Sequence, residues 1–217
     1  MAPYRQLSDL PQLIPVFPLD GALLLPGGEL PLQIFEPRYL NMVDDVMAGD
    51  RIIGMIQTRG GSRDRPTLAE VGCAGRITSY NETSDGRYLI TLTGICRFQA
   101  GEELDLRLPY RQVRAQYDRY ANDLDRDERA EAGGKARARF AAALKAYLNH
   151  RELDIDWETA NDAPLEALVN SLCMGLPFEP AEKQAFLEAP DLAGRFEVLT
   201  TLLEIDASDD DERPQLQ

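Results

Sequence analysis

Proline spacing near the N-terminus is the feature that most constrains this fold. Residues 13–39 read LIPVFPLDGALLLPGGELPLQIFEPRY, a series of short apolar runs separated by prolines. Because proline lacks an N–H and is confined to strand edges, strand starts and bulges, these runs predict irregular β structure rather than a helix. Pro37 then suits the first position of a helix, with Glu36 beside the positive end of that helix.

The composition is typical of a globular protein in a reducing compartment. With 217 residues and 44% apolar content the chain can bury a good core, and no apolar run approaches the roughly 20 residues of a membrane span. The start, MAPYRQLS, has no apolar segment followed by a cleavage site, so we expect no secretion. Cys73, Cys96 and Cys173 form no C-x-x-C pair. We therefore expect free thiols, no metal site and a cytoplasmic location.

Acidic charge is concentrated in the second part of the chain. Residues 1–120 hold 13 Arg and Lys against 15 Asp and Glu, whereas residues 121–217 hold 10 against 22, which makes the net charge of that part −12. A negative field of this kind repels phosphate backbones, so DNA is not an expected partner and RNA is disfavoured. The contrast also indicates two regions of different character.

The first region reads as strands around one short helix. We expect the helix after Pro37 to end near Gly49, and the polar residues 58–66 to form a loop. Asp85-Gly86 is a hairpin signal; a two-residue turn there pairs Ser84 with Arg87 and places Cys73 opposite position 98, unless a glycine-associated bulge shifts the register. The predicted strands are 51–57, 68–80, 87–98 and 109–120, in addition to those of the proline-rich start. Six or so short strands favour a β-barrel over a doubly wound sheet.

The second region reads as a helical bundle. We expect a helix from Asp125, weakened at Gly133-Gly134, and three more at 164–174, from Pro180 and after an Asp191 cap. The last twelve residues are polar and acidic, which predicts a disordered tail. The predicted organisation is a β subdomain over 1–120, a helical subdomain over 121–205 and a tail over 206–217.

Six short segments, in order along the chain, carry a resemblance to a known family. They are Ile14–Leu19, Leu25–Gly27, Leu30–Tyr39, Glu70–Gly72, Asp85–Leu89 and Gly94–Phe98. With looser similarity in the helical region, the chain resembles the N-terminal, substrate-binding domain of the ATP-dependent Lon protease over roughly residues 13–205. The resemblance implies an α+β fold, with a PUA-like (pseudo-)β-barrel followed by a helical bundle.

Neither nucleotide chemistry nor catalysis has a recognisable motif. The string Gly133-Gly134-Lys135 lacks the spacing and the hydroxyl of a phosphate loop. His150 is the only histidine, and it follows Asn149 at a polar helix end that suits a cation. The acidic clusters at 44–45, 102–103 and 209–212 read as solvated faces and tail. We therefore predict no catalytic, cofactor-binding or metal-binding residues, and the sequence does not indicate which residues would bind a protein.

Two sets of residues have both a structural and a binding interpretation. Trp157, the sole tryptophan, is interpreted as a packing anchor rather than a ligand platform. A set of four arginines straddles the last predicted strand and is interpreted as exposed positions paired with the acidic helical region, although a basic stripe on this type of barrel is also compatible with RNA. The set is Arg107, Arg111, Arg114 and Arg119.

The corner Glu36-Pro37-Arg38-Tyr39 is interpreted as structural. Pro37 sets the helix start, Tyr39 belongs to the apolar stripe of the helix, and Phe35 is expected to end the preceding strand on the barrel side. The corner is therefore predicted to join barrel and helix, rather than to contact a client protein.

These observations favour a non-catalytic, free-standing protein- or peptide-binding module, a monomer or weak dimer that recognises unfolded or partly folded chains. Exposed apolar surface and sheet edges supply such contacts without special residues. The alternatives are an RNA-binding barrel, an unrecognised hydrolase, and an adaptor that delivers clients to a protease or chaperone.

Overall fold

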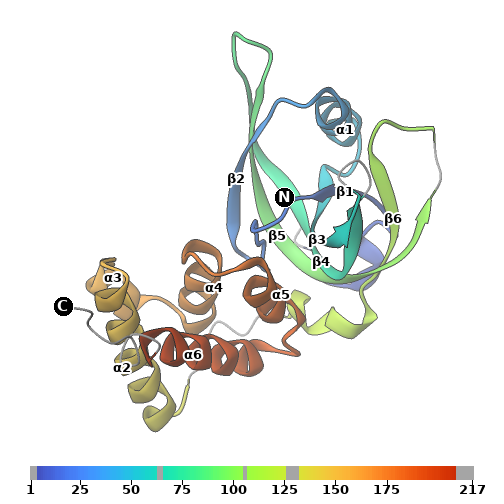
Figure 1. The fold of residues 1–217 in the computed structure, drawn as a ribbon. Coiled ribbons are helices and arrows are strands. Elements are labelled where there is room, and N and C mark those ends of the chain that lie inside the picture. Colours follow the sequence, from blue (N-terminus) through green and yellow to red (C-terminus); the bar gives the residue numbers. More distant parts are fainter. Residues whose placement is uncertain (1–3, 63–65, 105–106, 126–131, 209–217) are drawn as a thin grey trace.

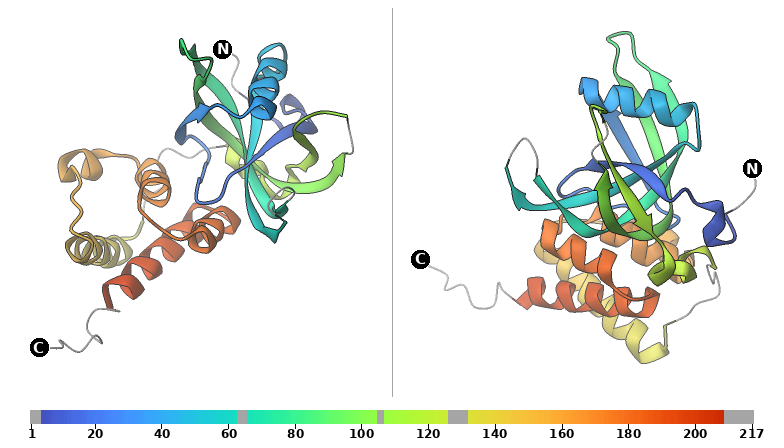
Figure 2. Two further views of the ribbon diagram at one scale, coloured as in Figure 1. Left: turned by 45° about the horizontal axis from the view of Figure 1, so that its top comes forward. Right: turned by 90° about the vertical axis from the view of Figure 1, so that its right-hand side faces the viewer.

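A β-barrel and a group of helices lie side by side in the computed structural model (Figure 1). The structure describes residues 4–62, 66–104, 107–125 and 132–208. Six strands and the first helix form the barrel, and helices α2 to α6 lie beyond one end of it, as the two further views in Figure 2 also show. The predicted α+β class, with strands preceding helices, is confirmed.

The barrel closes because β5, one of its two longest strands, has different partners along its length. The order is β2-β5-β4-β3-β1-β6, and β6 pairs again with β5. The first part of β5 pairs with β2, and its last part pairs with β6. Among the strand pairs of the described residues, β1 and β3 alone run parallel. The strands are β1 (Leu13–Pro18), β2 (Glu29–Ile34), β3 (Ile52–Gly61), β4 (Pro66–Glu82), β5 (Tyr88–Leu104) and β6 (Arg111–Gln116).

Helix α1 (Pro37–Met47) caps one end of the barrel and begins where proline predicted. It ends two residues before Gly49, however, and Gly49 is not the left-handed residue of the turn. Arg51 takes that conformation, with a φ of 61°, and its N–H donates to the Val46 carbonyl at 3.0 Å. The chain therefore leaves α1 through a left-handed arginine, whose N–H bonds the last turn of the helix, and not through a glycine.

The β4–β5 hairpin has a three-residue loop, so the predicted two-residue turn is wrong. Gly86 is left-handed at a φ of 79°, and the Thr83 N–H donates to the Arg87 carbonyl at 2.9 Å. This geometry suits three-residue loops with glycine in the left-handed position. The register moves by one residue. Two register shifts follow, one between Ile77 and Ser79 and one between Ala74 and Gly75, and they cancel, so that Cys73 lies opposite Arg97 rather than position 98.

Several strand boundaries also differ from prediction. β3 continues to Gly61 through residues expected to lie in a loop, because Thr58 and Gly61 pair with β4. β5 continues past residue 98 to Leu104 by pairing with β6. β6 itself stops at Gln116, and a 3₁₀ segment, η2 (Asp118–Leu124), replaces the expected end of that strand. A short 3₁₀ turn, η1 (Leu7–Asp9), precedes the barrel.

The helices are α2 (Gly134–His150), α3 (Trp157–Asp162), α4 (Leu165–Gly175), α5 (Pro180–Glu188) and α6 (Leu192–Ser208). Gly133 and Gly134 start α2 rather than weakening its interior, and the expected start after Asp125 lies outside the described residues. Asp191 accepts a hydrogen bond from the Gly194 N–H at 2.8 Å, as predicted for a cap. α6 runs through Ser208, so residues 206–208 are helical rather than tail. Among the described helices, none has the length and apolarity needed to cross a membrane.

Buried polar contacts join the helices to the barrel. Arg97 of β5 is 1% exposed and pairs with Asp123 of η2 at 2.8 Å. Its guanidinium also donates to the carbonyls of Leu187, in the last turn of α5, and of Ala189, which follows that helix. On another side, Asn170 of α4 donates to the Pro26 carbonyl at 2.9 Å. Because one contiguous set of buried apolar side chains runs through both halves, barrel and helices form one packed body.

Candidate functional site

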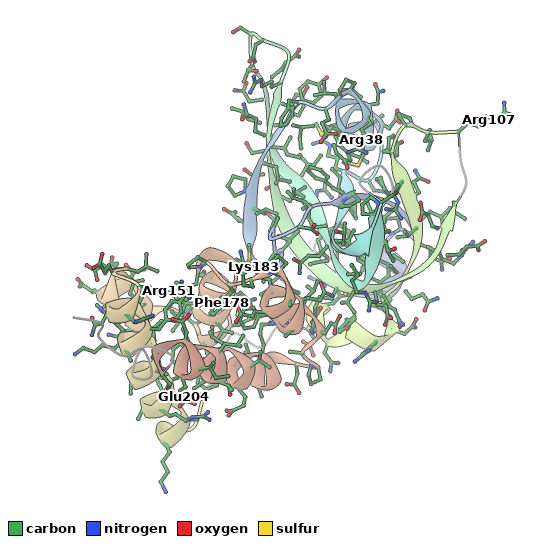
Figure 3. The ribbon with its side chains drawn as sticks, viewed as in Figure 1. Arg38, Arg107, Arg151, Phe178, Lys183 and Glu204 are labelled. Carbon is green, nitrogen blue, oxygen red and sulfur yellow. The ribbon has the colours of Figure 1, made fainter. Side chains whose placement is uncertain are left out.

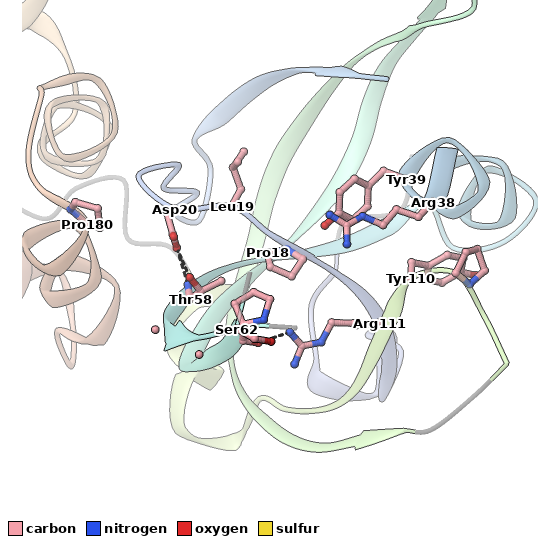
Figure 4. Close-up of a pocket in the computed structure, with 14 residues that line it drawn as sticks. Pro18, Leu19, Asp20, Arg38, Tyr39, Thr58, Ser62, Tyr110, Arg111 and Pro180 are labelled. Atoms are coloured by element: carbon pink, nitrogen blue, oxygen red, sulfur yellow. Dashed lines mark hydrogen bonds between the residues drawn. The ribbon is translucent and has the colours of Figure 1, made fainter. Parts of the chain in front are cut away.

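A hollow runs along the side of the barrel, from α1 toward Pro180 of α5. It has a volume of about 700 Å³ and is open to solvent. Figure 4 shows that its walls come from segments far apart in the sequence. They are Pro18 to Asp20 at the end of β1, Arg38 and Tyr39 of α1, Thr58 and Gly60 to Ser62 at the end of β3, Pro66, Pro109 to Arg111, and Pro180 of α5. We call this hollow the barrel groove.

An unpaired strand edge borders the barrel groove. β1 ends at Pro18, which pairs with Ile56, while β3 continues to Gly61 and pairs only with β4 there. Asp20 accepts the Thr58 N–H at 2.9 Å and so occupies one position of the missing strand. Among the described residues no strand pairs with this edge beyond that point. Backbone groups of a sheet edge are available to an added extended segment.

Two arginines in the groove are held by carboxylates. Arg38 pairs with Glu36 at 2.8 Å, and its guanidinium lies 4.5 Å from the centre of the Tyr39 ring. Arg111 pairs with Glu103 at 2.6 Å and donates to the Pro66 carbonyl at 2.6 Å. The groove therefore presents compensated charge beside proline, leucine and tyrosine side chains, and this mixture suits varied polypeptide segments.

Arg111 also separates the barrel groove from a second hollow. Pairing between β4 and β5 stops at Val71 and Gln99, and the two strands then diverge around a space of about 350 Å³. Arg111 spans this gap, because it bonds Glu103 on β5 and the Pro66 carbonyl on β4. The sheet is thus opened at the groove side and braced by one side chain.

The tyrosines of the barrel groove are poor proton acceptors or donors at neutral pH. Burial and the hydrogen bond to Asp45, at 2.6 Å, raise the pKa of Tyr110 to about 12. Burial likewise raises the pKa of Tyr39. Both phenols stay protonated, and they anchor α1 and the loop before β6 rather than exchange protons. Asp45 is exposed, as its sequence suggested, and also accepts this hydrogen bond from Tyr110.

His150 and Trp157 lie on the helices, away from the barrel groove. His150 ends α2, with its Nε2 atom 3.9 Å from Asp206 of α6, as a polar helix end predicted. Trp157 begins α3 and is 37% exposed, so it packs only in part and is not a buried anchor. It borders a small cavity with Phe140 and Leu168.

Among the described residues, no ion pair joins these four arginines to the helices, contrary to the prediction. Arg111 pairs with Glu103 of the neighbouring strand. Arg107 projects from the β5–β6 loop into solvent (Figure 3), and Arg114 is exposed on β6. Arg119 lies with its guanidinium 5.6 Å from the Tyr120 ring centre. The predicted exposure holds for Arg107, Arg114 and Arg119. The acidic partner of Arg111 belongs to the barrel rather than to the helices.

The cysteines are buried free thiols, as the sequence predicted. Cys73 and Cys96 lie in the barrel and Cys173 in α4. Burial raises the pKa of Cys96 and of Cys173 to about 12, so neither provides a thiolate at neutral pH. Within the described ranges, the structure brings together no three acidic, histidine or cysteine side chains that would hold a metal ion.

The chain belongs to the family of ATP-dependent protease La (Lon) substrate-binding domains. The model of that domain matches residues 13–204. Lon protease 2 of Myxococcus xanthus is 27% identical over 201 residues, which cover 90% of this chain and 24% of the relative. Lon protease of Anaeromyxobacter dehalogenans is 26% identical, with coverage of 90% and 23%. The chain thus spans about a quarter of these relatives.

Solved structures agree on the fold. A Lon N-terminal domain protein from Xanthomonas campestris matches with a TM-score of 0.63 and 21% identity, over 87% of this chain and 97% of that one. The N-terminal domain of a Mycobacterium avium complex Lon protease matches with a TM-score of 0.60 and 20% identity, over 91% and 98%. The resemblance proposed from the six segments is confirmed by the family match.

Proposed function

We propose that this protein is a non-catalytic module that binds unfolded or partly folded polypeptides in the barrel groove, as a monomer or weak dimer in a reducing cytoplasm. The observation that carries the proposal is the unpaired edge of β3 beside apolar and aromatic side chains. An extended segment would add to this edge through its backbone, and its side chains would contact Leu19 and the prolines of the groove.

The kind of site supports recognition of many sequences rather than one. Backbone pairing depends little on side-chain identity, and proline and leucine surfaces accept varied apolar groups. The family to which the chain belongs is described as a substrate-binding domain. Such a module serves as an adaptor when its client is passed to a protease or chaperone, which we include in the proposal. The three buried free thiols support the reducing location.

Binding of a permanently unfolded protein tests the proposal. The probe is a fluorescently labelled, reduced and carboxymethylated protein, and the readout is anisotropy against protein concentration. The variants Leu19→Asp and Pro109→Asp each place a negative charge on the wall of the barrel groove. Each should weaken binding on the order of tenfold. Leu13→Asp is the matched control, because Leu13 is exposed on β1 and does not line the groove.

Melting temperatures of all three variants establish that they are folded. Absence of saturable binding by the wild-type protein would reject the proposed function. Equal loss in the Leu13 control and the groove variants would reject the groove as its site. A labelled single-stranded RNA in the same assay provides the comparison with the RNA alternative, and tight RNA binding that falls steeply with salt would favour that alternative.

A further inference from the structure

A separate hollow lies on the helices, far along the chain from the barrel groove. It has a volume of about 500 Å³, within the range of about 300–1,000 Å³ common for ligand clefts. The loop after α2, the helix α3 and one face of α4 form its walls. The apolar walls include Leu153, Ile155, Leu168, Leu172 and Leu176. We call it the helical groove.

Small residues on α4 create the depth of the helical groove. Ala167, Ser171 and Gly175 follow one another at four-residue spacing, so they lie on one side of the helix, and all three line the groove. Ala160 and Ala163 of the α3 region face them across it. A row of short side chains lets another backbone approach closely, while Leu153, which is 40% exposed, stands at the edge.

The charged residues that line the helical groove have a single sign. They are Asp154 and Asp156, and no described arginine or lysine lines it. Asp156 accepts hydrogen bonds from the N–H groups of Glu158 and Thr159 at 3.0 and 3.1 Å. These bonds, with that from the Thr159 hydroxyl, lower the pKa of Asp156, so it is ionised at neutral pH. An apolar floor with an anionic rim favours an apolar ligand that carries positive charge beside it.

We infer that the helical groove binds a short amphipathic segment of a client polypeptide, with large apolar residues at helical spacing and lysine or arginine next to them. The apolar face would lie along α4 as a helix in a groove, and the basic residues would face Asp154 and Asp156. This inference rests on the proposed function and specifies one class of client. It assigns the acidity of the helical half a role in selection.

A designed peptide tests the inference directly. The probe is an 18-residue peptide of leucine and lysine with leucines at positions i, i+3, i+4 and i+7, and the readouts are peptide anisotropy and Trp157 emission. Trp157 begins α3, and Ala160 of the same helix lines the groove. Because the peptide lacks tryptophan, a change in emission comes from Trp157 and reports binding of the peptide beside α3. We expect saturable binding with a change in Trp157 emission. A peptide with glutamate in place of lysine should bind on the order of tenfold more weakly.

Three variants separate charge from volume. Asp154→Lys removes the net negative charge of the rim and should weaken binding of the lysine peptide on the order of tenfold. Ser171→Trp fills the groove at an exposed position of α4 without changing charge, and should abolish binding. Glu82→Lys is the matched control, since it makes the same charge change at an exposed position of the β4 end and should leave affinity unchanged.

The outcomes distinguish this inference from the proposed function. If Asp154→Lys and Ser171→Trp bind the lysine peptide like wild type, or if the glutamate peptide binds equally well, the inference is wrong, while binding of the unfolded probe in the barrel groove is unaffected. A dimer in sedimentation that Ser171→Trp dissociates would assign the groove to a second copy and also overturn it. Loss of binding only to the unfolded probe in Leu19→Asp supports two separate sites.

Discussion

Tyr39 joins α1 to the barrel through a single ring. Its side chain is 6% exposed, and its ring centre lies 4.3 Å from that of Phe17 in β1. Arg38 covers the outer face of the ring and pairs with Glu36 in solvent. The structural interpretation of this corner therefore extends to Tyr39. It does not extend to Phe35, which was expected on the barrel side but is 62% exposed.

Tyr39→Ala should destabilise the protein by about 2–4 kcal/mol, because it removes a large buried ring and leaves a cavity. Arg38→Ala is the control, since Arg38 is about half exposed and its ion pair with Glu36 is worth about 0–1 kcal/mol. Urea unfolding followed by circular dichroism measures both. Arg38 and Tyr39 also line the barrel groove, so wild-type stability of Tyr39→Ala together with weaker binding of the unfolded probe would give the corner a binding role in place of the structural one.

Thiol burial predicts a pH dependence. The pKa of Cys96 and of Cys173 is raised to about 12 in the folded state, against about 8.5 in an unfolded chain. The unfolded state therefore loses protons first, and the free energy of unfolding should fall as pH rises from about 8.5 toward 12. Denaturation at pH 8 and pH 10 checks the slope.

Thiol labelling complements that measurement. At pH 8 the native protein should label slowly at all three cysteines, and the denatured protein should label three. Rapid native labelling, or fewer than three thiols after denaturation without reductant, would contradict the buried free-thiol state. A stability that is flat above pH 8.5 would contradict the raised pKa values.

Residue patterns show which single side chains a sequence can place. Tyr39 is placed by its helical spacing from Val43 and Val46, because periodicity reports burial. Arg97 is not, since arginine is most often exposed. It is buried because Asp123 and the carbonyl groups at the end of α5 surround it, and these groups are distant in sequence.

At the scale of elements, the loop before β2 is fastened to β5 at one glycine. The Gly27 N–H donates to the Gly94 carbonyl at 2.8 Å, and the Gly94 N–H donates to the Gly28 carbonyl at 2.9 Å. A Cβ atom on Gly94 would lie 2.8 Å from the Leu25 carbonyl carbon, with the oxygen of that group closer still. The chain crosses β5 here with no room for a side chain.

Gly94→Ala should therefore destabilise the protein by about 1–3 kcal/mol through forced displacement of the loop. Gly49→Ala adds the same methyl group in open space after α1 and should change stability by about 0.5 kcal/mol or less. Thermal unfolding of the two variants gives the comparison. Similar melting temperatures for Gly94→Ala and Gly49→Ala would show that the loop moves aside at little cost.

Element type was predictable where a pattern was local, and boundaries were not where pairing decided them. Pro37 and Asp191 begin α1 and α6 because proline and aspartate act on the adjacent backbone. The end of β3 depends instead on pairing with β4, and the hairpin register depends on whether two or three residues form the loop. Those choices are made by tertiary contacts that periodicity does not contain.

At the scale of the whole molecule, both candidate sites are products of packing. The barrel groove collects residues from β1, α1, β3, the loop before β6 and α5, so no contiguous motif marks it. The helical groove is marked weakly by Ala167, Ser171 and Gly175, but small residues acquire meaning only once α3 lies opposite. The sequence could therefore predict a binding module through its family resemblance, and it could not locate the surface.

Asn170 is a suitable point at which to test whether barrel and helices unfold together. It is 3% exposed, donates to the Pro26 carbonyl of the barrel at 2.9 Å, and accepts from Arg195 of α6 at 2.9 Å. Asn170→Ala leaves both partners without that bond, which should cost about 1–3 kcal/mol. Because one set of buried side chains spans both halves, the free energy of unfolding should fall by the same amount for the barrel and for the helices.

Two reporters divide the molecule for this purpose. Trp157, the sole tryptophan, reports the helices, and labelling of Cys73 and Cys96 in a Cys173→Ala background reports the barrel. We expect their urea midpoints to coincide in the parent protein and to fall together in Asn170→Ala. Arg139→Ala, which loses exposed ion pairs between α2 and α6, should leave both midpoints close to those of the parent protein. Separate midpoints in the parent protein would instead establish two independent domains, each with its own binding groove.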